Sequence, residues 1–429
     1  MPDWKIIPKK ILGGESSFWK SIGPGIVTGA ADDDPSGIAT YSQAGAQIGT
    51  SILWSMPFTW PLMSAIQLVC AQIGRVTGHG LAANMRKYYG NKLVVPMVTL
   101  LLIANILNLG ADIGAMGAAA NLVIGGNMHI EALLFTLVSV LLQIFIPYHS
   151  YARILKWLTF VLFAYVGVVF FVRLPWAEVL RGTFIPTVKF DSSYVTTFVA
   201  LLGTTISPYL FFWQASQEVE EIDTHEDQQC LDESPLQAPL ALRHIRIDTL
   251  VGMGFSNLAA YFIILATAAT LHAHGVTKID TASQAAEALR PIAGDFCFAL
   301  FTIGIIGTGL LALPVLAGSA AYAVGESFGF KSSLEAKPLQ AKRFYSVIAV
   351  STLLGLFIIY TKINPIQALY WSAVINGVIS APVMIVVMIM ATRRKIMGQF
   401  TITRMWKVLG WAATAVMAGS VIVFFLTLG

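Results

Sequence analysis

Long apolar runs, separated by short charged or turn-rich breaks, dominate this chain. The runs are roughly 20 residues long, which is the length of helix that spans the hydrocarbon core of a bilayer. The pattern therefore predicts an all-α polytopic membrane protein. Its eleven predicted spans cover residues 21–43, 51–73, 95–122, 131–148, 154–174, 193–217, 247–272, 296–325, 344–361, 364–391 and 408–428.

The composition supports this prediction and excludes several classes of protein. Of the 429 residues, 56% are hydrophobic and 12% are charged, whereas a soluble domain is about 25% charged. None of the segments between spans contains a nucleotide-binding loop, so we expect no ATP-driven pumping. Because the net charge of +4 follows from the placement of bases around the membrane, it does not indicate binding to nucleic acid.

The Lys and Arg residues predict how the chain is oriented. With a cytosolic N-terminus, 21 of the 27 bases fall in cytosolic segments and 6 fall outside, as the positive-inside rule requires. Eleven spans then place the C-terminus outside. Residues 1–20 have no apolar core with a cleavage site and read as a cytosolic leader. We expect a ten-span transport core over 21–391, then a cytosolic loop and the eleventh span over 392–429, in the inner membrane of a bacterium.

The first span is interrupted by three consecutive acids, Asp32, Asp33 and Asp34. Each would cost about 3 kcal/mol at the centre of a membrane helix. Pro35 and Gly37 follow, so we predict an unwound backbone, which is tolerated at this depth where it lines a cavity. Two short helices joined by an exposed loop are the alternative, but neither flanking piece is long enough to span a bilayer.

The sixth span carries a second polar interruption, which includes Thr204, Thr205 and Ser207 before Pro208. A simple proline kink is the alternative explanation. However, this break comes five spans after the first, and paired broken helices in two five-span halves are typical of inverted-repeat transporters with a midplane site. Freed carbonyls and carboxylates at such breaks attract cations. We therefore predict two inverted repeats, spans 1–5 and 6–10, with span 11 as an addition.

These stretches resemble the NRAMP family of metal transporters. The residues from Gly23-Pro24-Gly25 to Gln43-Ala44-Gly45, with Asp34-Pro35-Ser36-Gly37 at their centre, are similar to its first helix, whose core is Asp-Pro-Gly-Asn. Ser207-Pro208-Tyr209 takes the position of the Met-Pro-His of its sixth helix, and residues 248–272 resemble its seventh. The resemblance covers most of the chain. It implies a LeuT-type fold of two inverted five-helix repeats, with helices 1 and 6 broken.

The resemblance also implies a metal site and shows where this chain departs from it. Asp34 corresponds to the metal-ligating carboxylate, and the carbonyls of Ala31 and Thr204 to further oxygen donors. Gly37 replaces the family's ligating Asn, and Ser207 replaces its Met, so a thioether is absent. Carboxylate, carbonyl and water ligands suit Mg²⁺ and Mn²⁺ better than softer metals. The pattern is similar to the NRAMP-related magnesium transporter branch.

The same resemblance shows that this chain differs from the family at residues that are used in proton coupling. Asp112 falls where the family keeps an Asp that is used in proton transfer, but Tyr209 replaces its histidine and Ala115 a glutamate. Asp112 is either a proton carrier or a structural acceptor, and Asp33 is a further candidate for proton binding or gating. Asn376, in span 10, lies near the position of a ligating Gln and is a candidate metal ligand.

A cluster of acids lies between Glu218 and Glu233, after the sixth span. It includes Glu220, Glu221 and Asp223. A funnel that collects metal ions is one interpretation. A solvated loop is the interpretation that we favour, because runs of charge are usually exposed to water.

The leading hypothesis is a transporter of hard divalent cations, Mg²⁺ or Mn²⁺, that works by alternating access without tight proton coupling. The alternatives are a proton-coupled Mn²⁺/Fe²⁺ importer of the standard NRAMP type, a Na⁺-coupled carrier of an organic substrate, and a non-transporting metal sensor. The acids argue against an organic substrate, and the chain ends after span 11 with no output domain for a sensor. We predict no enzyme activity, since no nucleophile–base pair is evident, and no cofactor. The expected partners are the metal ion as substrate, protons in the coupled case, and the lipid bilayer.

Overall fold

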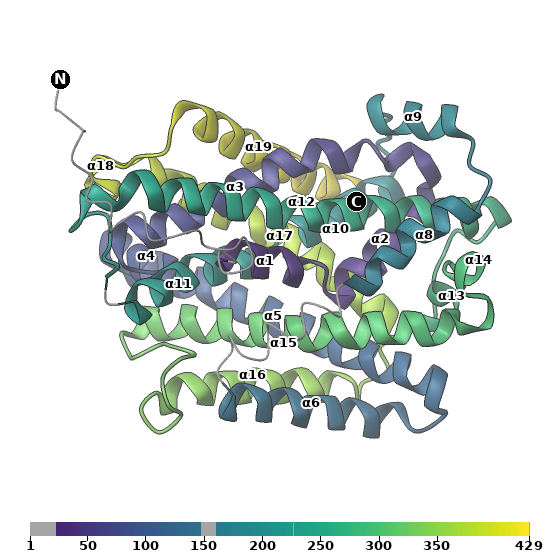
Figure 1. The fold of residues 1–429 in the computed structure, drawn as a ribbon, viewed down its shortest axis with the longest axis horizontal. Helices are drawn as coiled ribbons and strands as arrows, with labels where there is room; N and C mark the ends of the chain where they lie inside the picture. Colours follow the sequence, from purple (N-terminus) through teal and green to yellow (C-terminus); the bar gives the residue numbers. More distant parts are fainter. Residues whose placement is uncertain (1–22, 147–159, 226, 429) are drawn as a thin grey trace.

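The computed structural model describes residues 23–146, 160–225 and 227–428 (Figure 1). The predicted leader, 1–20, lies outside the described residues, as do parts of the predicted fourth and fifth spans. The first half contains α1 (Pro24–Asp32), α2 (Pro35–Ile48), η2 (Gly49–Ile52), α3 (Ser55–Thr77), α4 (Leu81–Tyr89), α5 (Asn91–Ile124), α6 (Met128–Phe145), η3 (Phe160–Phe163), α8 (Ala164–Phe171) and α9 (Trp176–Phe184).

The second half continues the helical pattern. It contains α10 (Ser192–Thr205), α11 (Pro208–Thr224), η4 (Pro235–Gln237), α12 (Ala238–Thr270), η5 (His272–His274), α13 (Ala282–Glu287), α14 (Arg290–Ala293), η6 (Gly294–Phe296), α15 (Cys297–Phe328), α16 (Lys342–Ile358), α17 (Pro365–Thr392), α18 (Arg394–Met397) and α19 (Arg404–Leu428). Helices lie at all eleven predicted spans, and both predicted breaks are present, between α1 and α2 and between α10 and α11. The fold is that of an integral, multi-pass membrane protein.

Length and apolar composition give a stricter test of the spans. Seven helical stretches of the described chain are long and apolar enough to cross a membrane, or eight if α2–η2 and α3, bent by 115°, count as one. The bent pair contains the end of the first predicted span and the whole helix of the second. Helix α16 has 17 residues and falls just short of the 18 that the test requires.

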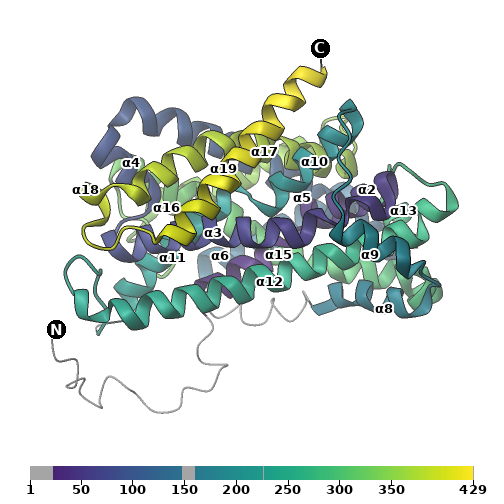
Figure 2. The same cartoon turned by 90° about the horizontal axis from the view of Figure 1, so that it is seen from above.

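The spans pack as two groups of four. Helices α5, α6, α15 and α16 contact one another and lie together along one side of the bundle, at the bottom of Figure 1. The broken helices α1–α2 and α10–α11 lie with α3 and α12 on the other side. Helix α17 contacts both groups, and α19 crosses one face of the bundle obliquely (Figure 2). The two breaks therefore lie inside the bundle, between the groups.

The two broken spans run in opposite directions. Gln47, near the end of α2, donates a hydrogen bond to the hydroxyl of Ser193 at the start of α10, at 2.5 Å. We call this the Asp280 end of the bundle, after the loop of residues 275–281 that lies there. At the opposite end the amide of Leu231 donates to the carbonyl of Arg75; we call it the Leu231 end (left in Figure 1). This antiparallel arrangement is what two inverted five-span halves require.

Glycines allow the helices to cross closely near the breaks. A side chain at Gly252 of α12 would overlap the backbone of Gly25 in α1, and one at Gly203 of α10 would overlap the backbone of Gly377 in α17. Small residues at membrane helix crossings let the backbones approach. One such contact thus lies beside each broken span.

The solvated-loop interpretation of the acidic cluster is wrong for its first residues. Residues 218–224 continue helix α11, and the side chains of Glu218 and Glu220 are buried. The carboxylate of Glu220 accepts a hydrogen bond from the amide of Leu334, at 2.5 Å, and Gln214 donates to Glu218. The density of charge along the sequence therefore led to a wrong prediction. Hydrogen-bond partners from α11 and from a distant loop make it possible to bury these two carboxylates.

The glycine contacts give a test of the packing. Gly252→Ala is expected to lower the unfolding temperature of the purified protein in detergent, because the added methyl group meets the α1 backbone and overpacking typically costs about 1–3 kcal/mol. Gly419→Ala in α19 is the control, since a methyl group there has open space within 4 Å. Helix propensity favours Ala over Gly at both sites, so it does not account for a difference in unfolding temperature between the two variants. Equal melting temperatures for the two variants would contradict the packing described here.

Candidate metal site at the helix breaks

The two breaks are built in the same way. Two residues with non-helical backbone separate α1 from α2 and α10 from α11, and a proline opens each second helix, Pro35 in α2 and Pro208 in α11. Proline suits the first helical position because the amide it lacks would have no partner there. Asp34 and Ser207 are the residues that precede them, in extended conformation. The sequence predicted both positions.

Asp34 caps the first turn of α2. Its Oδ1 accepts a hydrogen bond from the amide of Gly37, at 2.6 Å, and its side chain is 1% exposed. A helix N-terminus favours a carboxylate, because its amides have no partners within the helix and the dipole is positive there. Asp34 is therefore fixed at the break by its own helix.

The second carboxylate oxygen of Asp34 accepts hydrogen bonds from two other spans. Asn108 of α5 donates through Nδ2 at 3.1 Å, and the hydroxyl of Tyr209, from the start of α11, lies at 3.2 Å. The same hydroxyl is 3.4 Å from the carbonyl oxygen of Ala31. Tyr209 thus brings the second break against the first, and the Ala31 carbonyl lies beside Asp34.

A chain of polar side chains continues from Asn108 to span 10. Ser372 of α17 donates to Asn108 Oδ1 at 2.8 Å and lies 2.7 Å from the carbonyl oxygen of Leu369. Ser36, next to the proline of the first break, contacts Ser372 at 3.2 Å and donates to the same Leu369 carbonyl. Asn108, Ser36 and Ser372 are buried. Spans 1, 3 and 10 therefore meet at Asp34.

Asp32 and Asp33 point toward span 7. The hydroxyl of Ser256 in α12 lies 2.6 Å from Asp32 Oδ2 and 3.1 Å from Asp33 Oδ1. A hydroxyl has one proton, so it serves these two acceptors unequally. The three acids therefore do not converge on one point, as expected for consecutive residues with different directions.

The remaining predicted ligands lie around the second break. A side chain at Gly37 would contact the carbonyl oxygen of Asp32 at 3.1 Å and the Thr204 hydroxyl at 3.3 Å, so this position faces both breaks. The hydroxyl of Ser207 turns back onto the end of α10, where it lies 2.7 Å from the Gly203 carbonyl and 2.8 Å from the Thr204 carbonyl. The Ser207 hydroxyl thus contacts the Thr204 carbonyl, which the sequence analysis gave as an oxygen donor to the metal ion.

Asp112 and Asn376 are buried with unused acceptor atoms. Neither carboxylate oxygen of Asp112 accepts a hydrogen bond of good geometry, and the same holds for Oδ1 of Asn376. Asp112 lies within electrostatic range of Asp34. Next to Asn376, Ser380 of α17 donates to the carbonyl of Ile206 inside the second break, at 2.7 Å. Span 10 therefore makes hydrogen bonds to both breaks, through Ser372 to the first and through Ser380 to the second.

The acids at the breaks have no basic partner in the described part of the chain, where the ion pairs all lie between Lys278 and Asp295. Nor does any group of three His, Cys, Asp or Glu side chains in these residues have the geometry of a metal site. The arrangement instead offers one carboxylate with several neutral oxygens, which is a donor set for hard cations.

The sequence did not predict Asn108, Ser372 or Ser256. Asn108 lies one helical turn before Asp112 in α5, so residues on one helix face could have suggested it. Single polar residues inside an apolar run give no indication of which other span they meet. The contacts with Asp34 and the first break come from the tertiary structure.

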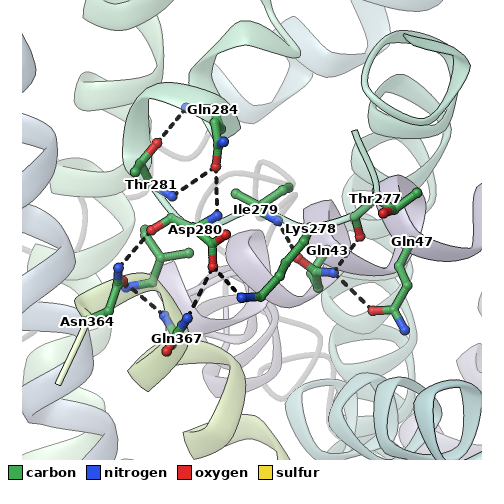
Figure 3. Close-up of polar contacts among 11 residues, drawn as sticks. Gln43, Gln47, Thr277, Lys278, Ile279, Asp280, Thr281, Gln284, Asn364 and Gln367 are labelled. Atoms are coloured by element: carbon green, nitrogen blue, oxygen red, sulfur yellow. Dashed lines mark hydrogen bonds and ion pairs between the residues drawn. The ribbon is translucent and has the colours of Figure 1, made fainter. Parts of the chain in front are cut away.

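The loop at the Asp280 end contacts α2 and the start of α17 (Figure 3). Gln43 of α2 donates to the carbonyl of Thr277 and accepts from the amide of Ile279, at 3.1 and 2.9 Å. Asn364 and Gln367, at the start of α17, donate to the carbonyl and to the carboxylate of Asp280. The loop is thus tied to spans 1 and 10, the two spans that also meet at Asp34.

The Asp280 carboxylate is held in its charged form. Lys278 donates to it at 2.8 Å, and this hydrogen bond, followed by that from Gln367, holds the pKa of Asp280 below its usual value. A lowered pKa means that the contacts are complete at neutral pH and are lost only as the pH falls through that lowered value. The loop attachment is therefore independent of pH in the physiological range.

At the Leu231 end the start of α1 is also tied down. The carboxylate of Asp248 in α12 accepts from the amides of Gly23 and Gly25, at 3.1 and 2.5 Å. Thr28 of α1 contacts the side-chain oxygen of Gln214 in α11, at 2.5 Å. Both halves of the first broken span are therefore anchored, and Asp34 lies buried between the anchors.

Comparisons with known proteins identify the family to which this chain belongs. The profile of the family described as "Natural resistance-associated macrophage protein-like", Nramp, matches residues 25–427. The chain belongs to the Nramp family. It is 26% identical, over 92% of its length and 91% of the relative's, to a protein of Klebsiella pneumoniae named "Divalent metal cation transporter MntH". A protein of the same name from Deinococcus radiodurans is 24% identical over 92% of this chain and 87% of the relative.

Solved structures confirm the fold of this Nramp chain. A crystal structure of the Eremococcus coleocola manganese transporter superposes with a TM-score of 0.75 at 16% identity, over 96% of this chain and 87% of that one. The inward-facing conformation of Mhp1 gives 0.55 at 13% identity, over 94% and 90%. The predicted LeuT-type fold, with two inverted five-helix repeats and an eleventh span, is confirmed.

The loop contacts give a second test. Gln43→Ala is expected to speed hydrogen exchange in residues 275–281, because the amide of Ile279 loses its acceptor. Mass-spectrometric exchange on the purified protein measures this. Gln217→Ala, which removes hydrogen bonds to Glu220 and Tyr322 near the Leu231 end, is the control and should leave that segment unchanged. The same exchange in both variants would contradict the attachment.

Proposed function

We propose that this protein carries divalent metal cations across the membrane, with the ion bound at Asp34 between the two helix breaks. The observation that carries this proposal is the buried Asp34 carboxylate, which meets three neutral donors and no basic side chain. The names of the Klebsiella and Eremococcus proteins, a divalent metal transporter and a manganese transporter, agree with it. The metal ion is the substrate, and we propose neither an enzyme activity nor a cofactor.

Charge balance supports a cation as the cargo. Three acids lie within three residues and are buried, and burial of a charge is costly unless it is paired. A divalent ion next to Asp34 would supply that pairing. An organic substrate would leave the acids uncompensated, so we place the cation ahead of it, although Mhp1, described as a nucleobase-cation symporter, shares the fold at a TM-score of 0.53.

We propose that the preferred ions are hard, Mg²⁺ or Mn²⁺. The ligands that we assign are the Asp34 carboxylate and the carbonyls of Ala31 and Thr204, with Ser207, Asn376 and the Gly37 position around them. The groups that we assign as ligands offer oxygen. Oxygen donors and retained water suit Mg²⁺ and Mn²⁺.

The distribution of bases supports a proposed orientation of the chain in the membrane. We assign the Leu231 end to the cytosol and the Asp280 end to the outside of a bacterial inner membrane, with the N-terminus inside and the C-terminus outside. In this assignment residues 21–391 are the transport core, and 392–429 add a cytosolic loop and the eleventh span. The anchors of α1 and α2 would open in turn, which is alternating access around a fixed midplane site.

We propose that transport proceeds without tight proton coupling. Tyr209 bonds to Asp34 as a neutral donor, and a tyrosine hydroxyl does not titrate near neutral pH. Asp112 and Asp33 are the acids left that could carry a proton. The standard proton-coupled mechanism therefore remains the alternative outcome of the test below.

The site assignment has a direct test. Asp34→Ala should reduce uptake of Mn²⁺ and Mg²⁺ into proteoliposomes to the level of empty vesicles, because it removes the charged ligand. Asp295→Ala is the control, since that acid is exposed at the Asp280 end and should leave uptake unchanged. Size-exclusion profiles report folding. Wild-type uptake by the folded Asp34→Ala protein would rule out Asp34 as the ion ligand.

The coupling proposal needs a separate measurement. Wild-type protein in proteoliposomes that contain a pH-sensitive dye should take up Mn²⁺ or Mg²⁺ with no matching acidification of the lumen. Uptake of Ca²⁺, Fe²⁺ and Cd²⁺ in the same assay gives the order of selectivity. Proton entry in fixed proportion to metal uptake would instead favour the proton-coupled alternative.

A further inference from the structure

We propose that Asn108 of α5 is a ligand of the transported cation, and that its side-chain amide turns over when the ion binds, so that Oδ1 replaces Nδ2 beside Asp34. This inference rests on the proposed function, a divalent-cation site at Asp34, and adds a residue to it. Asn108 would supply, from span 3, the amide oxygen that Gly37 does not supply from span 1.

The first step concerns the oxygen that Asn108 occupies. Asp34 Oδ1 is engaged by the amide of Gly37, which belongs to the backbone of the same helix. Asp34 Oδ2 accepts from side chains, Asn108 Nδ2 and the Tyr209 hydroxyl. A cation that approaches Oδ2 meets the positive hydrogen of the amide. The amide must therefore move away or turn.

The second step is that a turned amide would keep a hydrogen bond to Ser372. At present the single proton of the Ser372 hydroxyl faces two acceptors, Asn108 Oδ1 at 2.8 Å and the Leu369 carbonyl at 2.7 Å. After a turn, Nδ2 would donate to Ser372, and Ser372 would donate to Leu369. The Ser372 hydroxyl then accepts from one amide hydrogen and donates to one carbonyl, because a hydroxyl both donates and accepts. The turn costs no buried hydrogen bond at this end.

The third step concerns the Asn108 amide oxygen as a metal ligand and its burial in the bundle. An amide oxygen is a hard, neutral ligand of the kind that Mg²⁺ and Mn²⁺ accept, and it adds no charge beside the Asp34 carboxylate. Asn108 is 1% exposed, so its amide has no access to bulk water as a replacement partner. Its neighbours decide its orientation, and Asp34 with its ion is one of them.

The test replaces the amide with a soft ligand. Asn108→Cys should raise the affinity for Cd²⁺ relative to Mn²⁺ by at least about ten-fold, because thiolates prefer soft metals; titration calorimetry of the purified protein measures both ions. Asn105→Cys is the matched control. Asn105 lies one turn earlier in the same helix, is buried, and donates to Leu316 and Ser319, away from Asp34. Its Cd²⁺/Mn²⁺ ratio should equal that of the wild type.

The outcomes separate the two proposals. If wild-type protein binds Mn²⁺ but the two cysteine variants show the same ratio, Asn108 is not a ligand, while the ion site at Asp34 stands. If the wild type binds no divalent ion, the proposed function fails and this inference fails with it. Asn108→Met, which presents a thioether of similar length, replaces the cysteine variant if that variant does not fold, with Asn105→Met as its control.

Discussion

A carboxylate buried at a broken helix constrains the rest of this structure. Asp34 cannot be solvated in the interior of the bundle, so each of its oxygens needs a donor. Its own helix supplies the amide of Gly37. The others must come from elsewhere, and they come from α5 and α11. The break in span 1 can exist only where spans 3 and 6 approach it.

The same contacts connect the proposed ion site to the two ends of the bundle. Ser36 and Ser372 link the first break to α17, and Asn364, the N-cap residue of α17, donates to the carbonyl of Asp280 in the loop at the Asp280 end. In the other direction, α1 is held to α12 by Asp248. If Asp34 binds the ion as proposed, a change in what it binds would act on helices that reach both ends.

The sequence predicted the features that depend on the membrane alone. The positions of the spans follow from apolar length, and the breaks follow from acids and prolines that a straight membrane helix does not tolerate. It was wrong about Glu218 and Glu220, which are buried at the end of α11, and it did not find Asn108 or Ser256. These cases share a cause: whether a polar residue is buried and paired depends on which other span faces it, and periodicity along one span does not contain that information.

Neutral donors at Asp34 also bear on how tightly an ion can be held. Because Asn108, Tyr209 and Gly37 already satisfy the carboxylate, a cation exchanges one set of partners for another, and an exchange yields far less free energy than a bare carboxylate would give. Moderate affinity would suit the proposed carrier, which has to release its ion on the far side as readily as it takes it up. A site of several converging carboxylates would hold the ion more firmly. The turning of Asp32 and Asp33 toward Ser256 leaves Asp34 as the one acid at the break that faces spans 3 and 6.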